Sequence, residues 1–486
     1  MRNEQLIDLS SSSEQQVKQH VLNNIRQGVY ADKALPSYRQ MASMMRVSRQ
    51  TVMSVYQSLV DEGVIYCQQK KGYFAKQSGD STPLPSQYAT QRAPSPAVQQ
   101  QFWQQRFNTQ HREHEKAYKP LNWRNYPYPF IGHRPAPSMF PFTQWRECER
   151  LAQKSGIARD WNSESIDTDD TQLIKQLQTQ VLAKRGIHAS NDEILLTIGN
   201  QNSLYLLANL LLSPNTTIGM EEPGYISART IFAQHFAKLE PLALDTQGIA
   251  LSPTLSQCDY IYTMPDNQIP TNITMTAKRK EALLEAAEQR DFVLIEDDHQ
   301  SELNHLGHSA NLKSLDKHGR VIYLGSLSKT LAPAMQMGYI VASKHVICEL
   351  KKIRRMMYRH PSATSQRTCA LFLSMGYYDN YLKKLRNSDK QKWSEMRRAI
   401  EQYLPYTVDY ETIGGRSFWL RLPDHLDCST LTSQAEKLGI LVEPGDAYFS
   451  SQNPQSSRYI RLSYSAIDLE DIASGIQKLA KLIQSL

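Results

Sequence analysis

The chain carries a lysine, Lys329, just after a short apolar segment, and this position suggests chemistry. Lys329 follows the apolar segment Val321–Leu324, then Gly325 and a hydroxylated turn, Ser326–Ser328. The apolar run predicts a buried strand. A lysine held at the end of such a strand is partly desolvated, so its pKa falls and its neutral amine can attack an aldehyde. Taken alone, the segment is more typical of a surface lysine beside a serine-rich turn.

A carboxylate stands in a similar position about thirty residues upstream. The apolar segment Phe292–Ile295 runs directly into Glu296, Asp297, Asp298 and His299. A carboxylate at a strand end can pair with a pyridine nitrogen and keep it protonated, which makes the ring an electron sink.

These two segments resemble the active-site segments of fold-type I pyridoxal-phosphate (PLP) aminotransferases. The sequence motif Ser-Leu-Ser-Lys-Thr-Leu-Ala-Pro, residues 326–333, resembles in particular that of the MocR-type regulators. That branch joins a GntR-type winged helix to an aminotransferase-like domain. The resemblance implies that Lys329 forms the Schiff base with PLP and that Asp297 holds the pyridine nitrogen.

Further cofactor contacts are predicted where strands end. Residues 194–199 read as a strand, and Asn200 and Gln201 begin an apolar helix whose first amides could bind phosphate. A plain strand–helix junction is the alternative. Tyr225 follows another strand, and the resemblance implies that it stacks on the ring, with a core tyrosine as the alternative. The resemblance also implies contacts from Ser326, Ser328, Gln268, His299 and Gln336.

Three residues depart from the family pattern at this site. Gln336 stands where an arginine normally binds the PLP phosphate, His299 replaces a tyrosine that bonds the ring oxygen, and Asn272 breaks a Pro-Thr-Gly turn. One lost charged contact could cost about 1.5–3 kcal/mol, or roughly tenfold to a hundredfold in affinity. Lys329 and Asp297 remain. Imine chemistry is therefore retained in this interpretation, whereas efficient transamination is not expected.

Arg461 lies in the strand-like segment 459–463. It matches the arginine that holds the substrate carboxylate in fold-type I enzymes, and a planar guanidinium suits that task because it binds both oxygens at once. The resemblance therefore implies a grip on an effector carboxylate. A structural salt bridge is the alternative.

Histidine and glutamate residues after the segment 292–295 suggest a metal site as an alternative to the cofactor. His299, Glu302, His305 and His308 have a spacing that matches no metal site we can justify. We therefore predict no metal.

The N-terminal region has the pattern of a winged helix. Apolar spacing predicts a helix over 14–27, a second from Pro36–Ser37 to Met45, and a third from Ser48 to about Glu62. A two-stranded wing with a basic tip follows, up to Phe74. Helix, helix-turn-helix and wing in this order resemble the GntR-type domain.

The second helix of a helix-turn-helix places its N-terminal residues at base edges in the major groove. This region also holds ten Lys and Arg residues against six Asp and Glu between Met1 and Lys76, an excess that suits DNA. A winged helix used for protein contacts is the alternative. The predicted DNA-binding residues are Arg39, Ser48, Arg49, Gln50, Thr51, Lys70 and Lys71.

Length and composition set the domain organisation. A chain of 486 residues exceeds one ordinary domain. We predict a winged helix over 10–76, a Pro- and Gln-rich linker over 77–120 with a helix around 102–114, and an aminotransferase-like domain over 121–486. The predicted class of that domain is α/β, with a large, mostly parallel sheet and a small C-terminal α/β subdomain.

Location and assembly follow from similar arguments. No apolar run is long enough to cross a bilayer, and the first ten residues lack a signal-peptide segment. Six scattered cysteines are typical of reduced thiols, so we expect a cytoplasmic protein. The resemblance implies a homodimer with crossed-over DNA-binding domains.

Three functions remain open from the sequence. The first is a DNA-binding transcriptional regulator that senses PLP or a PLP adduct of an amino compound. The second is an active PLP-dependent aminotransferase with an accessory DNA-binding domain. The third is a regulator that has lost PLP and binds another ligand.

Overall fold

The computed structural model describes most of the chain, and its contacts divide the chain into two units, Met1–Gln110 and His111–Leu486. Each unit is described by itself. The described residues are 13–31, 33–68, 71–76, 96–106, 119–132, 137–154, 168–298, 301–303, 310–331, 335–404, 415–450 and 453–486.

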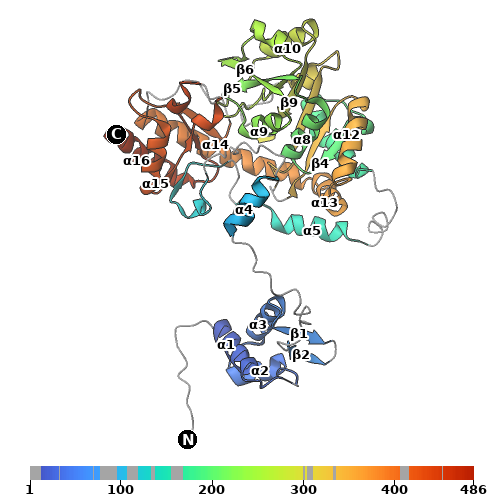
Figure 1. Cartoon of the computed structure of the whole chain (residues 1–486), viewed down its shortest axis with the longest axis vertical. Helices are drawn as coiled ribbons and strands as arrows, with labels where there is room; N and C mark the ends of the chain where they lie inside the picture. Colours follow the sequence, from blue (N-terminus) through green and yellow to red (C-terminus); the bar gives the residue numbers. More distant parts are fainter. Residues whose placement is uncertain are drawn as a thin grey trace. The chain divides into compact units, whose positions relative to one another are not determined.

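The first unit contains the predicted winged helix, with helix α1 (Ser13–Arg26), α2 (Tyr38–Met45) and α3 (Arg49–Asp61) followed by antiparallel strands β1 (Ile65–Gln68) and β2 (Gly72–Ala75) (Figure 1). Local signals set these bounds. The hydroxyl of Ser37 accepts from the backbone N–H of Gln40, and the Gln40 side chain bonds back to the amide of Ser37, which forms a capping box. The hydroxyl of Ser48 caps α3 by accepting from the backbone N–H of Thr51.

A small apolar core holds this winged helix together. It is formed where the three helices and the first wing strand meet, and a group of tyrosines (Tyr38, Tyr56 and Tyr73) packs ring against ring beside it. The fully buried members of the core include Val17, Val21, Met41, Val52, Tyr56 and Leu59.

A helix does form inside the predicted linker, but it starts earlier than expected. Helix α4 spans Pro96–Gln104, whereas the sequence predicted a helix around 102–114. Residues 107–114 of that prediction lie outside the described residues.

The second unit is built on one large sheet, as predicted. Eight strands follow the order β4-β11-β10-β9-β8-β5-β6-β7. Neighbours from β10 through β6 pair in parallel, while β11 runs antiparallel to both β10 and β4, and β7 pairs antiparallel with β6. The strands are β4 (Ile194–Thr197), β5 (Thr217–Glu222), β6 (Lys238–Asp245), β7 (Gly248–Ile249), β8 (Tyr260–Thr263), β9 (Val293–Asp298), β10 (Val321–Ser326) and β11 (Gly338–Val341).

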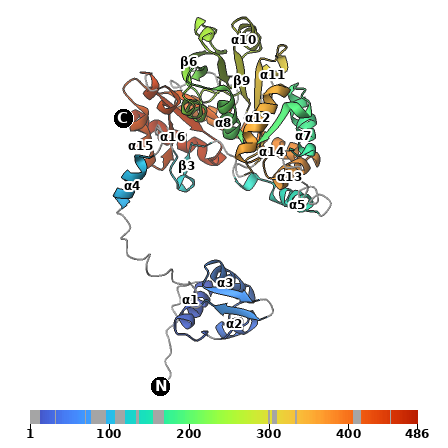
Figure 2. The same ribbon diagram turned by 45° about the vertical axis from the view of Figure 1, so that its right-hand side comes forward.

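Helices cover the sheet on both faces (Figures 1 and 2). Alternation along the strands divides the apolar residues: Leu195, Ile322 and Ile340 belong to one core cluster, whereas their neighbours Leu196, Tyr323 and Tyr339 belong to another. The helices are α5 (Phe142–Ala152), α7 (Thr171–Gln176, continued as a π-helical turn at Leu177–Leu182), α8 (Asn200–Leu211), α9 (Ile226–Gln234), α10 (Ala277–Gln289), α11 (Leu312–Leu315), α12 (Lys344–Met357), α13 (Ala363–Ser374) and α14 (Tyr377–Tyr403).

The small C-terminal subdomain has a core of its own. Strand β15 (Tyr459–Ser463) lies between β12 (Ser417–Arg421) and β14 (Glu443–Pro444), both antiparallel to it. Helices α15 (Cys428–Lys437) and α16 (Ile472–Ser485) pack against these strands, and β13 (Ile440–Leu441) pairs in parallel with β3 (Tyr128–Pro129).

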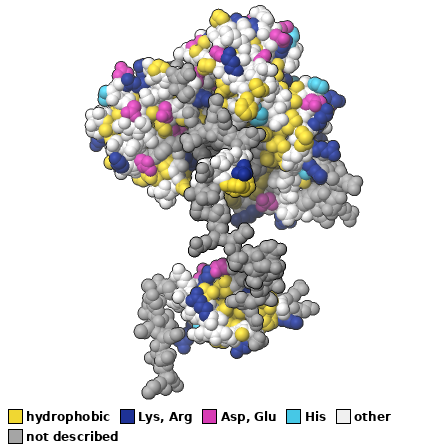
Figure 3. All heavy atoms as spheres, in the orientation of Figure 1, with side chains coloured by type: hydrophobic (Ala, Val, Ile, Leu, Met, Phe, Trp, Pro, Cys, Tyr) yellow, Lys and Arg dark blue, Asp and Glu magenta, His cyan; other side chains and the backbone are white. Residues whose placement is uncertain are grey.

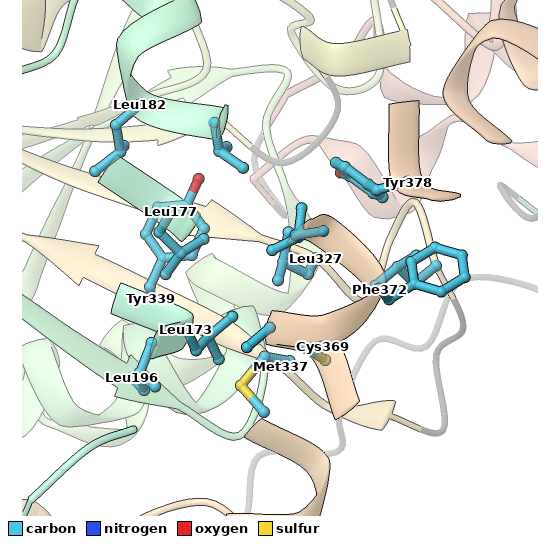
Figure 4. Close-up of a cluster of buried hydrophobic side chains, with 14 of the residues drawn as sticks. Leu173, Leu177, Leu182, Leu196, Leu327, Met337, Tyr339, Cys369, Phe372 and Tyr378 are labelled. Atoms are coloured by element: carbon cyan, nitrogen blue, oxygen red, sulfur yellow. The ribbon is translucent and has the colours of Figure 1, made fainter. Parts of the chain in front are cut away.

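Apolar residues on either side of Lys329 fix the ends of its loop. Leu327 and Met337 are buried in the cluster drawn in Figure 4, among side chains of α7 and α13. The backbone N–H of Leu327 also donates to the carbonyl of Met337 at 3.0 Å. The segment that carries Lys329 is therefore held at both ends by the core.

Two further properties concern the described parts of the chain. All six cysteines have free thiols. No helix among the described residues combines the length and the apolar composition that a membrane span requires.

Candidate functional site

Asp297 lies at the end of β9 and is buried, with 2% of its surface exposed. Its Oδ2 accepts hydrogen bonds from the hydroxyl of Tyr262 at 2.6 Å and from Nδ2 of Asn200 at 2.7 Å. The parallel pairing of β8 with β9 brings Tyr262 to this position, and the start of α8 brings Asn200. Three chain segments thus converge on one carboxylate.

Burial sets the charge state of this carboxylate. Desolvation raises the pKa of Asp297 from 3.8 to about 6, although the bonds from Tyr262 and Asn200 and the charge of Lys329 oppose the rise. Asp297 therefore remains ionised at neutral pH at an energetic cost, and a cation placed beside it would relieve that cost. A protonated ring nitrogen is a cation of this kind.

Lys329 follows β10 in a short turn and is half-buried. Its neighbours shape the turn: the hydroxyl of Ser328 accepts from the N–H of Met337 at 2.5 Å, and Thr330 donates to the carbonyl of Leu327 at 3.0 Å. The charge of Lys329 acts on the pKa of Asp297, so the two predicted reactive groups lie within electrostatic range of each other. The turn occupies Ser328 in its own closure, so a cofactor contact from its hydroxyl stays a prediction.

The start of α8 lies beside the end of the lysine segment. Gly199 has φ +88° at the helix N-cap, and a Cβ added to it would lie 3.8 Å from Cα of Gln336. Gln336 is exposed and itself has φ +44°. Gln201 is also exposed and donates to the hydroxyl of Ser227 at 3.3 Å. The predicted phosphate contacts, Gln336 and the α8 amides, are therefore brought to one place.

The segment before α9 carries the predicted stacking residue. Tyr225 is half-buried at the N-cap of α9 and packs against the core cluster that contains Tyr262. The pKa of Tyr262 is raised by burial, by Asp297 and, to a smaller extent, by Tyr225, so the two tyrosines lie within electrostatic range of each other. Stacking of Tyr225 on a ring stays a prediction.

The side chain of Gln268, a predicted cofactor contact, forms part of the framework of its own loop. Its Nε2 donates to Pro223 O at 2.7 Å and to Glu221 at 3.2 Å, and its Oε1 accepts two bonds from Thr271. A contact with a ring would require Gln268 to leave these partners. The side chain instead ties the loop to the segment that carries Tyr225.

The expectation that Asn272 breaks the turn is wrong. Asn272 adopts φ +58°, a left-handed conformation that asparagine tolerates better than most residues. Its Nδ2 donates to the carbonyl of Ser417 at 2.6 Å and to the Ser417 hydroxyl at 2.9 Å. The turn is kept, and the asparagine fastens it to β12 of the C-terminal subdomain.

Among the described residues, three buried polar atoms without a hydrogen-bond partner lie at this edge of the sheet. They are Oδ1 of Asn200, Oδ1 of Asn267 and Oγ of Ser326. Buried polar atoms are normally satisfied, and exceptions call for a ligand, a water or a functional reason. Asn200 begins α8, Asn267 follows β8, and Ser326 ends β10. These atoms suit a ligand that carries both donors and acceptors, as PLP does.

Arg461 is buried and paired, which agrees with the salt-bridge alternative. Its Nη1 donates to Oε2 of Glu443 at 2.8 Å, and both side chains are at most 5% exposed. The pKa of Arg461 is raised, because Tyr448 and Glu443 outweigh the opposing effect of burial. A grip on an effector carboxylate stays a prediction that must account for Glu443.

The acidic and histidine residues after β9 are only partly described. His299, His305 and His308 lie outside the described residues. Glu302 is described, and it accepts from Tyr378 at 2.6 Å and lies 3.3 Å from Nη2 of Arg185. Nowhere in the described ranges do three or more His, Cys, Asp or Glu side chains form a group that could hold a metal ion.

The predicted DNA-contact residues that the structure describes lie on α2, at the start of α3 and at the wing. Arg49 and Gln50 are exposed in the first turn of α3, and Arg39 is exposed on α2. The hydroxyls of Ser48 and Thr51 bond each other at 2.9 Å, and the Ser48 hydroxyl also caps the helix by accepting from the N–H of Thr51. Lys71 is exposed at the wing, whereas Lys70 lies outside the described residues.

In Figure 3, Lys and Arg side chains lie among hydrophobic ones on the visible face of this unit. The predicted DNA contacts do not include Arg46. This exposed residue has φ +53° and ends α2 in the turn of the motif. Its type and position between the two helices could have indicated it.

The sequence interpretation also missed two residues that bind predicted site residues of the aminotransferase-like domain. Tyr262 and Glu443 make the contacts to Asp297 and Arg461 described above, and each comes from a strand that pairs at long range. No local sequence signal indicates either contact.

Comparisons with known proteins agree with this architecture. Residues 13–74 match the family described as bacterial regulatory proteins, gntR family, and residues 147–479 match aminotransferase class I and II. The chain is 31% identical over 479 residues to the HTH-type transcriptional regulator TauR of Rhodobacter capsulatus, which covers 97% of both chains. It is 29% identical over 466 residues to the probable rhizopine catabolism regulatory protein MocR of Rhizobium meliloti, which covers 92% of this chain and 89% of that one.

Solved structures resemble the second unit. An archaeal alanine:glyoxylate aminotransferase superposes with a TM-score of 0.67 at 27% identity, covering 73% of this chain and 90% of that chain. The kynurenine aminotransferase of Pyrococcus horikoshii gives a TM-score of 0.69 at 25% identity, covering 84% and 99%.

Fold and matches together define a gntR-type winged helix joined to a fold-type I aminotransferase domain. The chain belongs to the MocR-type subfamily of the GntR family, and it is a transcriptional regulator with a DNA-binding domain and an aminotransferase-like domain.

Proposed function

We propose that the aminotransferase-like domain binds PLP through Lys329 and senses PLP or an amino-compound adduct of it. The observation that carries this proposal is the geometry around Asp297, a carboxylate buried near the end of β9 and held by Tyr262 and Asn200. The charge of Lys329 acts on this carboxylate, so the two groups lie within electrostatic range of each other. When bound, PLP supplies a carbonyl carbon for an amine and a ring that draws electrons away from it.

The chain's own residues would divide the binding between them. Lys329 offers the amine, and Asp297 holds a proton on the ring nitrogen while Tyr262 and Asn200 fix the orientation of its carboxylate. Donors and acceptors for the remaining polar groups come from the α8 amides, Ser326 and Asn267. Tyr225 is our proposed stacking residue.

Regulation requires that the two domains communicate. An amine that takes the place of Lys329 changes the contacts around the site, and it can shift DNA binding only if it binds two conformations with different affinity. We propose that the domain acts in a homodimer on double-stranded DNA, because a helix-turn-helix dimer reads two half-sites.

Turnover is not favoured by the site. Gln336 offers no charge for a phosphate, and Arg461 is already paired with Glu443. We therefore propose a sensor and not an efficient aminotransferase, with a half-reaction as the most that the site supports.

The test is the absorption spectrum of the purified full-length chain titrated with PLP, beside Lys329→Ala and an exposed control, Lys352→Ala. We expect a near-visible band from lysine-bound PLP in the wild type and the control, and none in Lys329→Ala. The absence of a band in all three proteins would refute the proposal and favour a regulator that has lost PLP. Sustained keto-acid production from an added amino acid would favour the aminotransferase.

A further inference from the structure

The contact between Glu443 and Arg461 goes beyond an ordinary salt bridge. The two residues face each other directly in the antiparallel pair of β14 and β15, and Nη1 of Arg461 lies 2.8 Å from Oε2 of Glu443. The side chains are 5% and 2% exposed. A carboxylate and a guanidinium so deeply buried hold each other strongly, because separating them would leave an uncompensated charge.

Two more donors from distant parts of the chain converge on the same carboxylate. The hydroxyl of Tyr448 donates to Oε2 at 2.9 Å, and the backbone N–H of Gly132 donates to Oε1 at 3.1 Å. A guanidinium, a phenol and a backbone amide together surround one carboxylate. This is the donor set that a bound ligand carboxylate would require.

This pair lies against the segments that form the candidate cofactor site. The carbonyl of Tyr448 accepts from the N–H of Gly224, the residue before Tyr225, at 2.8 Å. Trp419 is the strand partner of Arg461 in the sheet. Its ring packs edge-on against the ring of Tyr448, with 5.7 Å between the ring centroids. Tyr448 and Trp419 share a core cluster with Tyr262, the partner of Asp297.

We propose that Glu443 is a built-in substitute for the carboxylate of a ligand, so that the sensor accepts primary amines that lack an α-carboxylate. The proposal rests on the proposed function, because it concerns the amine that meets PLP at Lys329. An incoming α-carboxylate would have to remove Glu443 from Arg461 and leave a buried charge behind. An amine without that group leaves the pair intact.

The covalent step is an exchange of amines. The nitrogen of the incoming amine bonds to the cofactor carbon as the bond to Nζ of Lys329 breaks. Lys329 leaves as a free amine and takes up the protons that the incoming nitrogen loses. No oxidant or reductant is needed.

The experiment uses PLP-loaded full-length protein and two amines, ethylamine and L-alanine, which differ only by the carboxylate. Changes in the absorption band of lysine-bound PLP report the exchange. We expect the wild type to prefer ethylamine over L-alanine by roughly a hundredfold or more, the scale set by breaking a buried ion pair. Glu443→Gln should reduce that preference by a similar factor, whereas Glu470→Gln, an exposed control in the same subdomain, should not.

A second measurement needs no cofactor. Sodium propionate should raise the thermal transition of PLP-free Glu443→Gln, because Arg461 is then open to a free carboxylate, and it should leave the wild type unchanged. This comparison shows whether Glu443 is what keeps carboxylates away.

The outcomes separate the two proposals. A normal PLP band with equal uptake of both amines by the wild type would overturn the role of Glu443 and leave the proposed function standing. No PLP band in any of the proteins would overturn both. The comparison within the wild type decides the matter even where Glu443→Gln does not fold.

Discussion

Replacing Asp297 with asparagine should stabilise the protein without its cofactor while weakening PLP binding. Burial raises the pKa of Asp297 from 3.8 to about 6, so the folded state retains a proton that the unfolded state releases. Stability from this group is therefore greatest below pH 3.8, falls as the pH rises toward 6, and is constant above that. A difference of about two pKa units corresponds to about 3 kcal/mol at pH 8 and about half of that at pH 5.

The asparagine has nearly the same shape and keeps an oxygen that can accept from Tyr262 and Asn200. Asp297→Asn should thus raise the free energy of unfolding by up to about 3 kcal/mol at pH 8, with the gain reduced to about half at pH 5. Glu296, whose pKa burial raises to about 7, titrates in both proteins and cancels in the difference. Burial also raises the pKa of Glu221 to about 7, with a smaller contribution from the charge of Asp297, so the loss of that charge in the variant adds to the gain at pH 8 in the same direction.

Urea unfolding followed by tryptophan fluorescence measures the free energy of unfolding of the part of the chain that follows the winged helix. All six tryptophans lie at or beyond residue 103, and none lies in the winged helix. PLP added at pH 8 should then stabilise the wild type more than the variant. A gain that is the same at both pH values, or a variant less stable than the wild type at pH 8, would refute the argument from burial.

Other predictions concern the DNA-binding residues and the turn at Asn272. Lys71→Ala should weaken binding to random-sequence duplexes and lower the slope of log affinity against log salt by about one, which fluorescence anisotropy over a salt series would show; an unchanged slope would exclude a phosphate contact. Arg49→Ala should cost about 1–3 kcal/mol on a duplex selected in vitro and broaden the selected sequence, and an unaltered selection would exclude base readout. Ser48→Ala should remove about 1 kcal/mol from the stability of the winged helix, measured by hydrogen exchange in α3. Asn272→Ala should destabilise the second unit by about 1–3 kcal/mol in the same urea assay, more than Asn272→Gly, because alanine disfavours positive φ and both lose the bonds to Ser417.

The elements that local signals define were predicted well. Ser37 and Ser48 cap the helices of the winged helix where the sequence indicated, and Gly63 adopts a positive φ after α3. The ends of β9 and β10 place Asp297 and Lys329 as predicted, because apolar runs that end in polar or small residues are strong strand signals.

Contacts that depend on strand order could not be predicted. Tyr262 reaches Asp297 because β8 pairs in parallel with β9, and Glu443 reaches Arg461 because β14 pairs with β15. Neither pairing leaves a mark on the local sequence. The interpretation of Asn272 failed for a different reason: the lost glycine was taken as a lost turn, although asparagine can adopt the same backbone conformation.

Binding of PLP at Lys329 must also change binding of DNA if the domain is a sensor. The decisive measurement is the dissociation constant for a duplex selected in vitro, at one fixed salt concentration, with and without PLP, for the wild type and Lys329→Ala. We expect PLP to shift the wild-type constant by about fivefold or more and to leave the constant of Lys329→Ala unchanged. Equal constants in all four conditions, or the same shift in both proteins, would contradict a PLP-based sensor.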